Sequence, residues 1–106
     1  MTDVLLVYST VPDEETAQRI ARQLVEQRLA ACVSCLPQVH SVYHWQGKVE
    51  EARETVLMIK TTRSRFQPMA DRLRLLHPYD IPELIAVPVA AGLPDYLNWI
   101  QEETRG

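Results

Sequence analysis

The amino-acid sequence predicts one α+β domain over residues 1–106, in which an antiparallel sheet of βαββαβ order carries two helices and a third helix follows at the C-terminus. Three observations predict this fold class. A chain of 106 residues suits one domain. Its apolar residues change repeatedly between the period of a strand and the period of a helix. The four segments with strand character are short and are separated by turn residues or amphipathic helices.

An apolar run and an acidic helix start indicate the first strand and the first helix. Residues 4–8 are continuously apolar, which is typical of a central strand buried on both faces. Pro12 and the acidic run 13–15 indicate a helix start, because carboxylates favour the positive end of the helix dipole. Apolar residues within 17–29 recur at helical spacing, so we expect an amphipathic helix packed on the sheet.

A long hairpin is predicted next. Residues 32–45 form a second strand whose apolar side chains keep one parity, beginning with Val33 and Cys35. A turn at 46–48 and the alternation in 55–60 bring the chain back as the third strand. Each arm spans roughly 14 residues against a usual ~5 to 6, so the tip is expected to extend beyond the helices.

The remaining elements are a second helix, a fourth strand and a closing helix. Either Thr62 or Ser64 can cap the second helix, which ends at His77 before a proline. Residues 84–89 form the last strand, and Gly92 opens the closing helix. This order is the split βαβ, ferredoxin-like arrangement, with the first and third strands in the centre of the sheet.

The prolines agree with this strand order, and the sheet edges suggest self-association. Pro37 and Pro88 fall in the second and fourth strands, which are the edges, where a missing N–H is tolerated. Two bare edges and the aromatic tip at Tyr43 and Trp45 are surfaces that strand addition or packing would cover. We therefore expect a homo-oligomer, with Tyr43 and Trp45 at the interface.

Charge, hydropathy and glycine content exclude several classes of function. Lys+Arg 11 against Asp+Glu 14 leaves no cationic excess for nucleic acid or an anionic membrane. No apolar run approaches the ~20 residues of a membrane span, and the N-terminus lacks a signal-peptide pattern. We expect a cytoplasmic protein. The three isolated glycines allow no nucleotide loop, so we predict no nucleotide or organic cofactor. Ser9 and Ser41 lack the sequence context of a nucleophile elbow, so we also predict no enzymatic activity.

The two cysteines have the C-x-x-C spacing but lie within a predicted strand. Cys32 and Cys35 would then point to opposite faces, roughly 10 Å apart and beyond the ~7 Å limit of a disulfide. No second pair completes a zinc site. We expect two free thiols, with Cys35 a small hydrophobic residue of the core.

The histidines suggest two kinds of site. His40 and His44 lie on one strand face roughly 13 Å apart, which is too far for both rings to bind one metal ion within a subunit. They could form a metal site only if copies of the same histidine from several subunits gather around an oligomer axis. His77 either caps the second helix or, with the rest of 77–83, forms a rim for a cation or a small polar ligand. Tyr79 and Glu83 are then cleft residues.

Lys60 completes the candidate ligand-binding cleft. It shares a strand face with Glu54, and the two side chains are as compatible with a solvated ion pair as with the lining of a pocket.

Six strings along the chain carry a resemblance to a known family. They are residues 8–12, 29–33, 41–47, 57–61, 77–83 and 96–100. Together, and in this order over nearly the whole chain, they resemble the CutA divalent-cation tolerance family.

The resemblance implies a tight homotrimer, similar in architecture to PII-type signalling trimers, with a role in tolerance to copper and other divalent metals. It also implies sites in clefts between subunits. Cys32 in the string 29–33 and His77 in the string 77–83 are the best candidates for binding copper as Cu2+. The alternative is a trimeric signalling or interaction module, with a protein partner still to be identified, whose metal binding is incidental.

Overall fold

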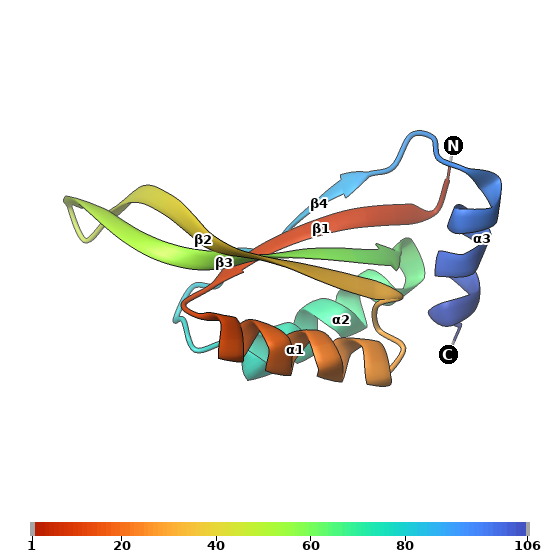
Figure 1. The fold of residues 1–106 in the computed structure, drawn as a ribbon, viewed down its shortest axis with the longest axis horizontal. Helices are drawn as coiled ribbons and strands as arrows, with labels where there is room; N and C mark the ends of the chain where they lie inside the picture. The colour runs from red at the N-terminus through yellow and green to blue at the C-terminus, as the bar shows by residue number, and fades with distance from the viewer. Residues whose placement is uncertain (1, 106) are drawn as a thin grey trace.

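A computed structural model describes residues 2–105 and confirms the predicted order of elements (Figure 1). The sheet has the order β2-β3-β1-β4 with antiparallel pairs throughout, so the first and third strands are central as the prolines predicted. The elements are β1 (Val4–Val11), α1 (Glu14–Glu26), β2 (Cys32–Trp45), β3 (Lys48–Thr62), α2 (Arg63–Leu76), β4 (Ile85–Pro88) and α3 (Pro94–Glu103).

The first helix begins where the acidic run predicted. The backbone N–H of Thr16 donates to Asp13 Oδ1 at 2.7 Å, and this hydrogen bond lowers the pKa of the Asp13 carboxyl. The apolar stripe of α1 packs with α2 on one face of the sheet and forms the main core. Its fully buried members include Ala17, Ile20 and Leu24 of α1, Met69 and Leu73 of α2, and Val7, Leu57 and Ile59 of the central strands.

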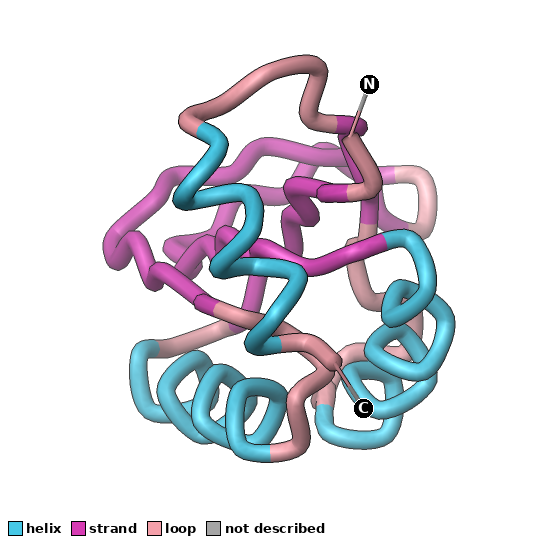
Figure 2. Tube along the Cα trace, turned by 90° about the vertical axis from the view of Figure 1, so that its right-hand side faces the viewer, coloured by secondary structure: helices cyan, strands magenta, loops and turns pink. Residues whose placement is uncertain are grey.

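The other two helices differ slightly from expectation at their starts. Thr62 precedes α2 as its N-cap residue without a side-chain capping bond, and α3 begins at Pro94 rather than at Gly92. Figure 2 shows α3 lying across one end of the sheet. Its C-terminal end reaches the α1–α2 layer, where Arg65 Nε of α2 donates to the Thr104 carbonyl at 2.7 Å. At this end of the sheet, Ile100 packs against Val4 and Ala31 in a second, smaller cluster.

One face of the sheet is left uncovered within the subunit. The expectation that residues 4–8 are buried on both faces is wrong for the single chain, because Val7 is fully buried whereas Leu6 and Tyr8 on the opposite face are only partly buried. Leu36, Ile85 and Val87 on this face are 42%, 57% and 50% exposed. We call this surface the open sheet face; its apolar members are Leu6, Tyr8, Leu36, Val56, Met58, Ile85 and Val87.

A β-bulge interrupts the second strand. The register shifts between Leu36 and Val39, so that Pro37 and Gln38 together oppose one residue of β3, and Gln38 has a φ of 59°. The extra residue reverses which side chains face the helices. The single parity expected for residues 32–45 is therefore wrong, since its apolar members face the helices before the bulge and the opposite side after it.

The hairpin projects beyond the helices, as its length predicted (Figure 1). Its turn has left-handed backbone at Gln46 and Gly47, with φ of 51° and 81°, as the two-residue turns of hairpins require. Because of the bulge, Tyr43 and Trp45 lie on the side of the ribbon that continues the open sheet face. Their side chains are 43% and 41% exposed in the single chain.

The cysteines occupy opposite faces of β2, as expected. Cys32 pairs with Lys60 and Cys35 with Leu57, residues that differ in parity on β3. The expected core position of Cys35 is wrong, because this thiol is exposed at the edge strand. The desolvation that it does experience, together with the nearby Glu14 carboxylate, raises its pKa.

We expect both thiols to be free in the native protein. Unfolding the protein in denaturant with an alkylating agent but no reductant should give a mass increase of two adducts, because Cys32 and Cys35 are on opposite faces. A reduced sample provides the control. An unmodified pair that reacts only after reduction would contradict the strand register.

Candidate functional site

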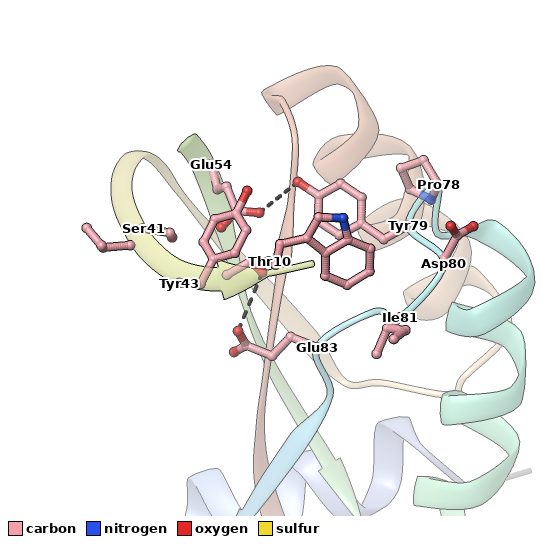
Figure 3. Close-up of a pocket in the computed structure, with 11 residues that line it drawn as sticks. Thr10, Ser41, Tyr43, Glu54, Pro78, Tyr79, Asp80, Ile81 and Glu83 are labelled. Atoms are coloured by element: carbon pink, nitrogen blue, oxygen red, sulfur yellow. Dashed lines mark hydrogen bonds between the residues drawn. The ribbon is translucent and has the colours of Figure 1, made fainter. Parts of the chain in front are cut away.

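A cavity of about 670 Å3 lies between the hairpin and the loop that connects α2 to β4 (Figure 3). Its lining is aromatic and acidic, with hydroxyl groups from Thr10 and Ser41. The aromatic rings are those of Tyr43, Trp45 and Tyr79, and the carboxylates are those of Glu54, Asp80 and Glu83.

His77 attaches this loop to the central strand. Its Nε2 lies 2.7 Å from the Thr10 carbonyl, and its Nδ1 accepts the Tyr79 backbone N–H at 3.1 Å. A carbonyl only accepts and an N–H only donates, so these partners assign the neutral ring with its proton on Nε2. Burial lowers the pKa of His77, which is 7% exposed, and so maintains the neutral form.

A tyrosine and a buried carboxylate meet inside the cavity. The Tyr79 hydroxyl donates to Glu54 Oε2 at 2.7 Å, and Glu54 is only 8% exposed (Figure 3). Burial raises the pKa of Tyr79 far above its ordinary value, and the hydrogen bond and charge of Glu54 add to this effect. The phenol therefore remains a donor. Among residues 2–105, Glu54 has neither an ion-pair partner nor a hydrogen bond to its Oε1 atom.

The other carboxylates make the cavity strongly negative. Asp80 and Glu83 are exposed in the loop, and the Thr10 hydroxyl lies 3.5 Å from Glu83 Oε1. No lysine, arginine or histidine is part of the described lining. The cavity therefore combines aromatic surface with uncompensated negative charge.

Two of the three residues predicted for a ligand cleft are in this lining. Tyr79 and Glu83 line the cavity, whereas Lys60 lies on the open sheet face. The Lys60 Nζ donates to Ser34 Oγ at 3.0 Å and lies 3.8 Å from Cys32 Sγ. It makes no ion pair with Glu54, because six residues along a strand separate the two side chains by roughly 20 Å.

The predicted metal ligands occupy different parts of the subunit. Cys32 is beside Lys60 on the open sheet face, while His77 is fixed to Thr10 near the other end of β1. On the hairpin, the His40 Nε2 lies 2.6 Å from Glu51 Oε1. The described part of the chain contains no group of three or more His, Cys, Asp or Glu side chains placed to hold a metal ion.

Sequence reasoning left Glu54 open between a solvated ion pair and the lining of a pocket, and it placed Tyr43 and Trp45 only at an interface. The available signal for Glu54 was its position directly before the apolar alternation of β3, since a charged residue is unusual on a covered part of a strand. The signal for the two aromatic residues was Pro37, since a proline inside a strand indicates a bulge.

Comparisons with known proteins give consistent results. A family model described as CutA1 divalent ion tolerance protein matches residues 5–103. The divalent-cation tolerance protein CutA of Thermus thermophilus is 48% identical over 104 residues, which are 98% of this chain and 99% of that protein. The chloroplastic CutA protein of Arabidopsis thaliana is 42% identical over 101 residues, covering 95% of this chain. Those residues are 56% of the plant protein, so the chain spans about half its length.

A solved structure extends the likeness to the fold. The crystal structure of CutA from Xylella fastidiosa superposes with a TM-score of 0.96 at 50% identity, covering 98% of this chain and 100% of that one. In residues 2–105, the helices are all too short or too polar to cross a membrane.

Proposed function

Because the chain belongs to the CutA1 divalent ion tolerance family, we propose that it acts in divalent-cation tolerance as a homotrimer that binds metal between its subunits. The proposed metal is copper, and the role is binding rather than catalysis. The cytoplasmic location stays a prediction, since the plant relative is named as chloroplastic.

The exposed apolar surface of the open sheet face is the observation that supports the proposed trimer. It exposes large apolar side chains on both central and edge strands, and monomers rarely leave such a contiguous apolar surface in water. A chain this short has a thin core, so burial on assembly adds a large share of its apolar contacts. A trimer with the three sheets turned inward, as in PII-type proteins, covers this face. Tyr43 and Trp45 then extend the contact along the hairpin.

Cys32 is the preferred copper ligand. Its side chain lies on the open sheet face, so the proposed assembly brings copies of the thiol toward one another, and thiolates favour copper over hard cations. The Lys60 Nζ lies 3.8 Å from its Sγ. His77 is the second candidate, but both its ring nitrogens have partners, and it must release the Thr10 carbonyl before Nε2 can bind a metal. His40 and His44, three copies each, are the rival set.

Copper titration of the anaerobic, reduced protein against a chelator tests this proposal. We expect Cys32→Ser to weaken copper affinity at least about tenfold, as the loss of a ligand or of its immediate support does at metal sites. Cys35→Ser is the matched control, because this thiol faces the other side of β2. If Cys32→Ser, His77→Ala and a His40, His44 double variant all keep the original affinity, metal binding is adventitious and the signalling alternative becomes the better one.

A further inference from the structure

A half-buried ammonium group lies on the open sheet face without a carboxylate partner. Lys60 is on β3, between Leu6 and Cys32 on the two neighbouring strands. Its Nζ donates to Ser34 Oγ at 3.0 Å, and within residues 2–105 it makes no ion pair. A second subunit packed on this face would remove water from the ammonium group, which is costly unless a carboxylate takes the place of the water.

The opposite charge lies on the same face of the same strand. Six residues separate Glu54 from Lys60, so both side chains point to one side of β3. Glu54 Oε2 accepts the Tyr79 hydroxyl at 2.7 Å, whereas Glu54 Oε1 has no hydrogen bond and is not fully enclosed. A further donor can therefore reach Oε1 from the cavity.

The cavity around Glu54 opens toward the surface that the proposed trimer covers. Tyr43 and Trp45 line it, and both lie on the side of the hairpin that continues the open sheet face (Figure 3). Asp80 and Glu83 add negative charge, and the described lining contains no lysine, arginine or histidine. A subunit that covers this opening would leave the carboxylates without water unless it supplies a cation.

The two charged regions match between subunits although they cannot meet within one. Roughly 20 Å separates the Glu54 and Lys60 positions along β3. A closed ring of three subunits repeats one heterologous contact, in which two different patches of neighbouring subunits meet. A sheet face with a positive end and a negative end suits this contact, because the positive end of one subunit meets the negative end of the next.

We propose that Lys60 of the partner subunit enters this cavity and is the counter-ion of Glu54. The cavity is then incomplete within a single chain, and the rings of Tyr43 and Trp45 pack against the methylene groups of the entering lysine. The inference rests on the trimer proposed above. It adds the pair of charges that sets how neighbouring subunits are aligned.

A water-soluble carbodiimide tests this contact in the unmodified protein. The reagent activates a carboxylate, and a contacting amine then displaces the urea, so that an amide forms with the net loss of one water. We expect covalent dimers and trimers on a denaturing gel, and, after trypsin digestion at partial reaction, the peptide 54–63 joined to a second copy of itself. Each chain contains that peptide only once, so this link joins two chains.

Lys60→Gln should abolish this link. The chain has two lysines, and Lys48→Gln is the matched control because Lys48 is exposed at the turn of the hairpin. The control should give the same linked peptide as the unmodified protein. Links that persist in Lys60→Gln at the same yield, or that join Lys60 only to carboxylates outside the cavity, would overturn the proposal.

The stability of the trimer provides a second measurement. Lys60→Gln and Glu54→Gln should each raise the subunit dissociation constant at least about tenfold, since each leaves one charge of the pair without its partner. The double variant should lose less than the product of the two single effects, because the pair is already broken. Effects that simply multiply would show that the two side chains are not in contact.

Sedimentation of the unmodified protein separates the two possible failures. A monomer would reject the proposed trimer and this contact together. A trimer that gives no link between Lys60 and the cavity carboxylates would reject the contact alone and leave the trimer standing. Because the cross-link is formed in the unmodified protein, its result does not depend on how any variant folds.

Discussion

Replacing Met58 with glutamate is expected to abolish assembly, so that the protein sediments at its chain mass of 12.2 kDa rather than at three times that mass. Met58 is at the centre of the open sheet face, where it is paired with Tyr8 on one neighbouring strand and with Ser34 on the other. In a trimer that covers this face, each subunit would bury an unpaired carboxylate, which costs several kcal/mol per site. In a monomer the same side chain faces water.

Leu75→Glu is the matched control for this variant. Leu75 is 78% exposed on α2, so the substitution adds the same charge to the helix side of the subunit and should leave the trimer intact. Circular dichroism should show that both variants remain folded. An unmodified protein that sediments as a monomer, or a Met58→Glu trimer with unchanged melting, would mean that the open sheet face is not the contact surface.

Periodicity in the sequence predicted the strand order, because apolar residue types indicate which side chains are buried. The residue type does not indicate whether the same subunit or a neighbouring subunit buries the side chain. The apolar run at residues 4–8 indicated burial on two faces, whereas in the subunit only the face that carries Val7 is fully covered. Tyr8 and Leu6, which are partly buried, carry the same apolar signal as a core residue would.

The bulge in β2 shows where alternation fails as a guide. One inserted residue at Pro37 and Gln38 leaves the parity of the sequence unbroken while it exchanges the two faces of the strand. Side chains before and after it then look equivalent in sequence but lie on opposite sides. This is why the position of Tyr43 in the cavity was not foreseen. Cys35 precedes the bulge and keeps the expected face, and it is exposed because β2 is an edge strand.

The cavity depends on contacts between residues far apart in the chain. The Glu54–Tyr79 hydrogen bond joins a strand to a loop 25 residues later, and the attachment of His77 to Thr10 sets the position of that loop. A sequence pattern reports local periods and caps, so it identified the segment 77–83 as unusual without identifying what it contacts.

The structural role of His77 predicts a large loss of stability when its side chain is removed. His77→Ala leaves the Thr10 carbonyl and the Tyr79 N–H without partners, and we expect it to lower the free energy of unfolding by about 2 to 4 kcal/mol at pH 7. Urea unfolding at a fixed protein concentration measures this change. His44→Gln on the exposed hairpin provides the control and should be nearly neutral.

The pH dependence of stability should also be due in part to His77. Burial lowers its pKa in the folded state below the ordinary 6.5, so the unfolded chain binds the proton first as the pH falls. The stabilisation is therefore complete above about pH 7 and declines as the pH falls through 6.5 toward the lower folded-state value, before the carboxylates titrate. Between about pH 7 and 5, the unfolding free energy of the unmodified protein should fall more steeply than that of His77→Ala. Parallel slopes for these two proteins, with His44→Gln behaving like the unmodified chain, would show that His77 is not the buried neutral ring that its two hydrogen bonds assign.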